Sequence, residues 1–301
     1  MKRSPAGVFA RGLAMGAADI VPGVSGGTIA LITGIYEQLL EAIVSADGDA
    51  LSMAVSGRWN ELWHRIDGGF LSILLLGILI AIFSMASGIH WLLSHYPQPL
   101  WSFFSGLILI SSVLLIRDEV MLDSIDCLAG FTFGVCIAVG AVLMPPVSFL
   151  VGLPGLFFAG AIAICAMILP GISGSFLLVL MGMYEQVLLA VKTLQVTELS
   201  VLAAGCVTGL LLFARLLQRC LQRYRALAMA FLSGVLMGSL VAVWPWRQEV
   251  LLNTAKGAIS ASRPVLPSTV TDAQLSACFG ACLIGCFLVW GTQALASRRD
   301  L

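Results

Sequence analysis

Two glycine-rich segments that interrupt apolar stretches are the parts of this chain best suited to bind an anion. The first reads PGVSGG at residues 22–27, and the second reads PGISGS at residues 170–175. Glycines leave backbone N–H groups unobstructed, and Ser25 or Ser173 can cap the helix that follows. A loop of this kind at a helix N-terminus favours a phosphate or carboxylate. The candidate phosphate-binding residues are Gly23, Ser25, Gly26, Gly27, Thr28, Gly171, Ser173, Gly174 and Ser175.

These loops are not nucleotide-binding loops, and a purely structural alternative stays open. Neither is followed by Gly-Lys-Ser/Thr, so neither is a Walker loop. Ser175 stands where the first loop has Gly27, so the two loops need not share one backbone geometry. The alternative is that the breaks only let a hairpin pack closely among its neighbours. Their occurrence as a matched pair favours a functional role.

Two glutamates at matched positions are candidates for coupling to a proton or cation. Glu37 and Glu185 each lie in a Tyr-Glu-Gln triplet, 15 residues after the proline of the preceding loop. At about 1.5 Å per helical residue, they would lie near opposite membrane interfaces. A carboxylate there is costly unless it is paired or faces water. The alternative is that the triplets are interfacial anchors, with Tyr36 and Tyr184 at headgroup level.

Three further charged residues lie near the loops or near the end of an apolar stretch. Asp19 precedes the first loop and has no acidic counterpart before the second. A buried carboxylate there would repel an anion unless it is protonated or paired, so Asp19 is a third candidate for coupling or gating. Arg11 and Arg215 could contact a lipid headgroup. Long basic side chains at such positions also commonly extend to the membrane interface, and this second interpretation stays open.

The loops and triplets belong to an internal duplication that organises the whole chain. The matched segments are 22–27 with 170–175, 33–43 with 181–191, 71–77 with 199–205, and 103–109 with 231–237. We therefore predict two repeats, at residues 1–146 and 147–301.

Each repeat is predicted to hold one re-entrant helical hairpin, at about 8–44 and about 147–192. Proline disfavours a helix, so the first arms should end near Val21 and Leu169 and the second arms restart at the Ser/Gly positions. Stretches of about 20 apolar residues predict spans. They lie at about 70–93, 99–116, 127–145, 199–217, 227–245 and 274–296. Three crossings invert the second repeat, so the predicted fold is an all-α polytopic membrane protein of two inverted-topology repeats.

The basic residues predict that both termini are cytoplasmic, because cytoplasmic loops carry an excess of lysine and arginine. The predicted cytoplasmic residues are Lys2, Arg3, Arg11, Arg58, Arg65, Arg117, Arg215, Arg219, Arg223, Arg225, Arg298 and Arg299. The predicted external ones are Lys192, Arg247, Lys256 and Arg263. Residues 45–69 then form an amphipathic cytoplasmic connection, and residues 246–272 form an external loop.

Composition supports the membrane assignment and narrows the classes of function. Hydrophobic residues make up 59% of the chain, charged residues make up 11%, and the net charge is zero. We expect no nucleic-acid partner. Cys278, Cys282 and Cys286 share one helix face, which suits small packing residues better than a metal site. We predict no disulfide, metal or cofactor.

The paired PGxSGG/S and Tyr-Glu-Gln motifs, on a chain of this length, resemble the bacterial polyprenyl-phosphate transporter family. The resemblance covers essentially the whole chain. It implies a multi-pass protein of the bacterial cytoplasmic membrane that returns undecaprenyl phosphate from the outer to the inner leaflet, which recycles the carrier lipid for peptidoglycan and other envelope polymers. It also implies that the two glycine loops, Glu37 and Glu185 are the main functional positions.

We therefore predict a transporter rather than an enzyme, with undecaprenyl phosphate and the bilayer as its partners. Proton or cation coupling is expected, and the oligomeric state stays open, with a homodimer among the options. One alternative is a transporter of ions or small anions. The other is a membrane enzyme acting on lipid phosphates, against which none of the three histidines lies near the glycine loops.

Overall fold

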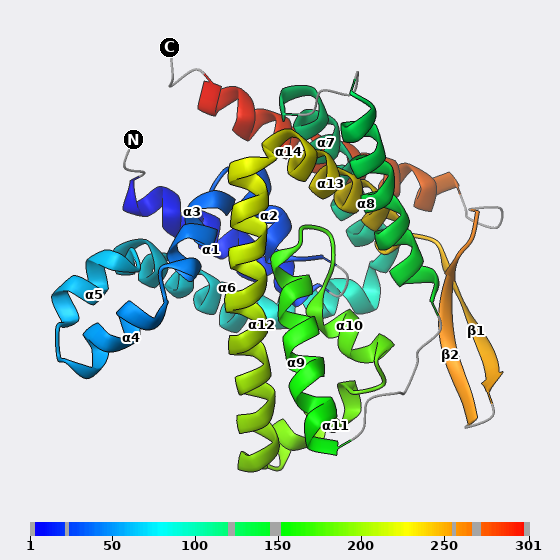
Figure 1. Cartoon of the computed structure of the whole chain (residues 1–301). Helices are drawn as coiled ribbons and strands as arrows, with labels where there is room; N and C mark the ends of the chain where they lie inside the picture. The colour runs from blue at the N-terminus through cyan, green and yellow to red at the C-terminus, as the bar shows by residue number, and fades with distance from the viewer. Residues whose placement is uncertain are drawn as a thin grey trace.

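Helices dominate the computed structural model, which describes residues 4–21, 24–119, 124–144, 152–254, 257–266 and 272–297. In Figure 1, α12 runs the height of the molecule beside α9, and a strand hairpin projects from one side. The elements are α1 (Pro5–Ile20), α2 (Gly26–Ile32), α3 (Tyr36–Val44), α4 (Gly48–Val55), α5 (Trp59–Arg65), α6 (Gly68–His95), α7 (Pro97–Glu119), α8 (Ile125–Leu143), α9 (Gly152–Ile168), α10 (Gly174–Leu180), α11 (Tyr184–Lys192), α12 (Val196–Arg223), α13 (Arg225–Gly238), a 3-10 turn (Ser239–Val241), β1 (Arg247–Thr254), β2 (Gly257–Pro264) and α14 (Asp272–Ser297).

Five helices are long and apolar enough to cross a membrane, which makes the chain a polytopic membrane protein. These are α6, α7, α8, α12 and α14, within the residues the structure describes. The sixth predicted span, 227–245, is not a helix of that length, because α13 has 14 residues and passes into the 3-10 turn. Pro245 cannot continue a helix and disfavours helical geometry at the residue before it. The apolar stretch is therefore longer than its helix.

The helices break at the two glycine loops, where the sequence predicts. The helix α1 ends at Ile20, and α2 begins at Gly26; the helix α9 ends at Ile168, and α10 begins at Gly174.

The second arm of each predicted hairpin is not one helix, which corrects the sequence prediction. The helices α2 and α3 meet at 117°, and α10 and α11 meet at 114°. Gly34 and Gly182 lie at these bends with φ of 71° and 67°. Glycine adopts this left-handed conformation readily, and it commonly ends a helix. Both bends fall in matched segments of the duplication, so each half repeats the same break, bend and second helix.

The first helix of each half packs on a long helix through matched glycines. The helix α1 lies against α6, and α9 lies against α12. A Cβ added to Gly12 would lie 2.3 Å from the Leu74 carbonyl oxygen, and one added to Gly160 would lie 2.5 Å from that of Leu202. Only glycine permits such an approach, so the backbones touch directly. Both contacts join residues at matched positions of the duplication.

The last helix of each half packs against the other half, again through glycines, and the residues that these glycines meet, Phe231 and Phe103, are matched in the duplication. The helix α8 lies along α13, and α14 lies along α7. A Cβ on Gly134 would meet the Phe231 carbonyl oxygen at 2.3 Å, and a Cβ on Gly285 would meet that of Phe103 at 2.2 Å. This exchange of helices ties the two halves into one structure.

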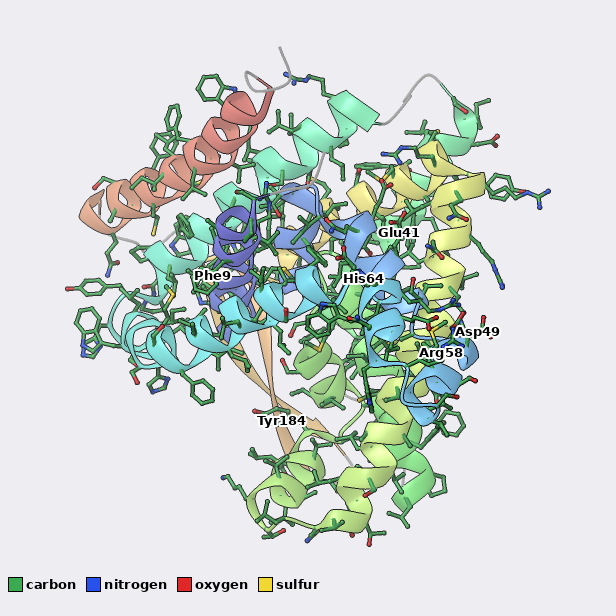
Figure 2. The ribbon with its side chains drawn as sticks, turned by 90° about the vertical axis from the view of Figure 1, so that its left-hand side faces the viewer. Phe9, Glu41, Asp49, Arg58, His64 and Tyr184 are labelled. Atoms are coloured by element: carbon green, nitrogen blue, oxygen red, sulfur yellow. The ribbon has the colours of Figure 1, made fainter. Side chains whose placement is uncertain are left out.

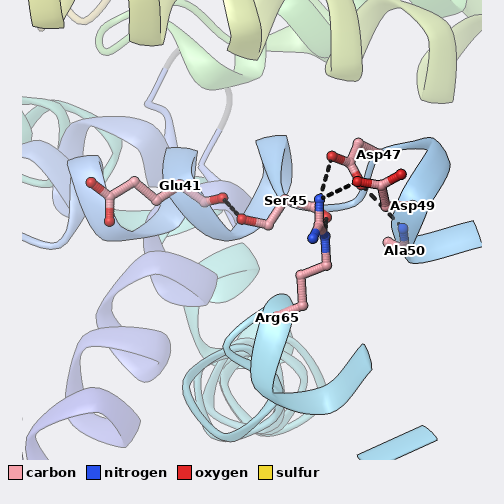
Figure 3. Close-up of polar contacts among 6 residues, drawn as sticks. All are labelled: Glu41, Ser45, Asp47, Asp49, Ala50 and Arg65. Atoms are coloured by element: carbon pink, nitrogen blue, oxygen red, sulfur yellow. Dashed lines mark hydrogen bonds and ion pairs between the residues drawn. The ribbon is translucent and has the colours of Figure 1, made fainter. Parts of the chain in front are cut away.

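Two small elements lie outside the long helices. Residues 45–69 form α4 and α5, and Figure 3 shows Arg65 reaching back to the residues at the start of α4. The Arg65 guanidinium lies 2.6 Å from Asp47 and 3.2 Å from Asp49, and it holds the pKa of the Asp47 carboxyl below its usual range. Within the predicted external loop, β1 and β2 form an antiparallel hairpin.

Candidate functional site

The two helix breaks, far apart in sequence, meet in the interior. The Ser25 hydroxyl donates to the Met167 carbonyl oxygen at 3.0 Å, next to the end of α9. The Gly171 N–H donates to the Thr28 hydroxyl at 2.8 Å. Ser25 and Thr28 are buried, with exposures of 2% and 0%. A Cβ on Gly27 would lie 2.8 Å from the Met167 carbonyl oxygen, so the small residues of one loop are needed for the other to approach.

In the first loop, the protein itself occupies the backbone donors that could hold an anion. The Gly26 N–H donates to the Asp19 carboxylate at 2.6 Å. The Gly27 N–H donates to the Ser25 hydroxyl at 3.1 Å, and the Thr28 N–H donates to the Ser25 carbonyl oxygen at 2.9 Å. Ser25 therefore caps α2 as predicted. A carboxyl oxygen of Asp19 thus occupies the Gly26 N–H, while Gly23 lies outside the described residues.

The second loop is built differently, and the expectation that Ser173 caps its helix is wrong. The Ser173 side chain accepts no capping hydrogen bond and lies 2.9 Å from the Ser175 hydroxyl. The first loop has Gly27 at the place of Ser175, so it has no competing hydroxyl. Ser175 is exposed, whereas Gly174 is buried beneath it. The two hydroxyls are thus the accessible polar groups of this loop.

The two matched glutamates have different surroundings. Glu37 accepts a hydrogen bond from the Arg225 guanidinium at 2.8 Å, and both side chains are about half exposed. Glu185 is exposed in the first turn of α11. Figure 2 shows Glu41, one turn after Glu37, and Tyr184, next to Glu185, well apart in the molecule. Arg225 could not be identified as the partner of Glu37 from the sequence, because the two residues are 188 positions apart.

The tyrosines of the two triplets also have different surroundings. Tyr36 is 3% exposed, and its hydroxyl donates to the Ile168 carbonyl oxygen at 2.9 Å, at the end of α9. Tyr36 therefore joins α3 to the end of the first helix of the other half. Tyr184 is 41% exposed, which leaves it free to act as an anchor.

The two candidate arginines lie on α1 and α12. The Arg11 Nε donates to the Thr33 carbonyl oxygen at 3.2 Å, and a terminal nitrogen donates to the Gly7 carbonyl oxygen at 3.0 Å. Arg11 therefore supports the bend between α2 and α3. Arg215 is half-buried on α12, the helix that packs against α3.

The comparisons with known proteins agree on one family. The family described as undecaprenyl phosphate translocase-like matches residues 15–260. A polyprenyl-phosphate transporter of Vibrio cholerae serotype O1 is 45% identical over 242 residues, which is 80% of this chain and 78% of that protein. A polyprenyl-phosphate transporter of Staphylococcus aureus is 33% identical over 256 residues, which is 78% of this chain and 84% of that protein. No solved structure matches the chain.

Proposed function

Because the chain belongs to the undecaprenyl phosphate translocase-like family, we propose that it carries undecaprenyl phosphate from the outer to the inner leaflet of the cytoplasmic membrane. Both relatives are named as polyprenyl-phosphate transporters, and they match most of the chain. The family match over residues 15–260 is the observation that carries this proposal. The polyprenyl tail stays in lipid while the phosphate crosses through protein, so no bond to phosphorus is broken.

Two inverted repeats with re-entrant breaks would let the protein face each leaflet in turn. The matched glycine contacts of α1 with α6 and of α9 with α12 support the two repeats, as does the exchange of α8 and α14. Cysteines replacing Ser56 and Leu266 in a cysteine-free background should differ in labelling by an impermeant reagent applied to intact cells. We expect labelling at 266 alone, because the basic residues place 45–69 inside. Labelling at both positions would contradict the inverted arrangement.

The phosphate would cross where the two breaks meet. The contact between Asp19 and the Gly26 N–H supports this placement, because it uses an N–H at the first loop to hold an oxyanion. A phosphate that approaches the same N–H must displace the carboxylate or meet it protonated. The Ser173 and Ser175 hydroxyls give the second loop two further donors. The other loop residues named above would line this route.

Proton coupling follows from the same competition. A proton taken up by Asp19 removes its charge, weakens its bond to Gly26 and ends its repulsion of the phosphate. Glu37 and Glu185 would take part at the two ends of the path, where Glu37 is paired and Glu185 is exposed. Arg11 would hold the bend at Thr33, and Arg215 would contribute positive charge beside α3.

A reconstituted assay tests the proposal against its alternatives. Purified protein in liposomes that contain undecaprenyl phosphate should speed exchange of the lipid between leaflets without releasing inorganic phosphate. Release of phosphate from undecaprenyl phosphate or its pyrophosphate would identify an enzyme. If exchange is no faster than in protein-free liposomes, both with and without a pH gradient, transport of this lipid is refuted.

A further inference from the structure

A polar pocket lies between α3 and the junction of α12 and α13, away from the two helix breaks. Its volume is about 240 Å³. Its polar lining comes from Glu37 and Glu41 on α3, Gln218 and Gln222 on α12, and Arg225 on α13. It therefore spans helices from both halves of the duplication.

The donors of this pocket suit a phosphate. An arginine guanidinium presents a planar fork of N–H groups that binds phosphate oxygens in pairs. Gln218 and Gln222 are four residues apart on a helix, so their amides lie on one side of it. Leu40 and Leu221, which also line the pocket, are 1% and 6% exposed and form a rigid apolar floor.

The Glu37 carboxylate that pairs with Arg225 can be replaced by another anion. Glu37 lies 2.8 Å from the guanidinium, with the two side chains 51% and 50% exposed. Ion pairs this exposed contribute little to stability, so a dianionic phosphate can compete for the arginine. Glu37 would then pair with Arg225 again when the phosphate leaves.

The residues at the matched places of the other half differ in type from those of the pocket. Pro97 stands where Arg225 would have its counterpart, and Leu189 stands where Glu41 would. Glu185 is therefore without a matched arginine.

We propose that Arg225, with Gln218 and Gln222, forms a second binding subsite for the phosphate of the transported lipid, and that Glu37 occupies the arginine between transport events. The proposal rests on the proposed function. In the predicted orientation this end is cytoplasmic, because Arg219 and Arg223 lie beside it, so the subsite receives the phosphate before release.

The test measures binding of undecaprenyl phosphate to the full-length protein in nanodiscs of uncharged lipid. Arg225→Gln should weaken binding about tenfold or more, because a hydrogen-bonded charge is lost. Glu37→Gln should strengthen it severalfold, because the arginine loses its competitor. Arg219→Gln, near the end of α12 and outside the residues that line the pocket, is the matched control and should change binding little. Thermal unfolding confirms that each variant is folded, and Arg225→Lys gives a second variant that keeps the charge.

The opposite signs for Arg225→Gln and Glu37→Gln identify the subsite. If both variants weaken binding, or neither changes it, the pair is a structural tie and the subsite is refuted, while binding by the wild-type protein leaves the proposed function standing. Inorganic phosphate should displace the lipid only at much higher concentration. Equal affinity for inorganic phosphate would indicate a site for free phosphate and overturn the assignment to a lipid headgroup. Absence of lipid binding by the wild-type protein would instead refute the proposed function.

Discussion

Replacing Asp19 by asparagine tests whether its carboxylate only stabilises the first loop or also competes with the substrate. Asp19 accepts the Gly26 N–H at 2.6 Å, and asparagine can accept the same bond without a charge. A charge-assisted hydrogen bond is about twice as strong as a neutral one. The change should therefore loosen this contact by about 1 kcal/mol while it leaves the loop built.

The same substitution should raise the affinity for undecaprenyl phosphate. Removing one negative charge beside the loop, together with the weaker internal bond, should tighten binding about tenfold, which corresponds to about 1.4 kcal/mol. The transport rate of the variant should depend less on pH, because the residue that takes up the proton is gone. Asp49→Asn, on an exposed carboxylate of α4, is the control.

The assays are lipid binding in nanodiscs and leaflet exchange in liposomes across a series of pH values. A folded Asp19→Asn variant with wild-type affinity and a wild-type pH profile would refute the competition between Asp19 and the phosphate. A variant that binds more weakly would show instead that the carboxylate helps to build the binding loop.

Two further predictions concern the contacts that hold the two halves together. Thr28→Val should lower the free energy of unfolding by about 1–3 kcal/mol, because the buried Gly171 N–H loses its acceptor. Thr28→Ser keeps the hydroxyl and should cost less. Equal thermal unfolding temperatures for Thr28→Val and the wild-type protein would contradict this prediction. Gly12→Val and Gly160→Val should each disrupt helix packing, because a Cβ there would lie 2.3 Å and 2.5 Å from a backbone oxygen. Gly280→Ala, with open space around the glycine, should be tolerated. Equal yields of folded protein for all three variants would contradict the matched helix contacts.

Much of the fold could be predicted from the sequence because its signals are local. Proline and glycine end α1 and α9 where expected, and apolar length identifies α6, α7, α8, α12 and α14. The bends at Gly34 and Gly182 could also have been predicted from the sequence, since both glycines occupy matched positions of the duplication. Apolar length alone misjudged α13, because Pro245 and the 3-10 turn end the helix within an apolar stretch.

The candidate site was harder to predict because its partners are set by packing between distant segments. The sequence placed Asp19 near the first loop, but only the structure identifies the Gly26 N–H as its partner. Ser173 has the sequence context of a cap, yet its hydroxyl pairs with that of Ser175. The Arg225 partner of Glu37 comes from the other half of the chain, and no local pattern marks it.

The rate of leaflet exchange of undecaprenyl phosphate in liposomes tests the central claim most directly, when the wild-type protein is compared with a Ser173→Ala/Ser175→Ala double variant. The two hydroxyls touch each other at an accessible loop, so their removal should leave the fold intact. Wild-type protein should exceed protein-free liposomes, and the double variant should be slower by about tenfold, since hydrogen bonds to a charged group are lost. Ser200→Ala, an exposed serine on α12, should match wild type. Equal exchange by the double variant and wild type would contradict passage of the phosphate through the two breaks.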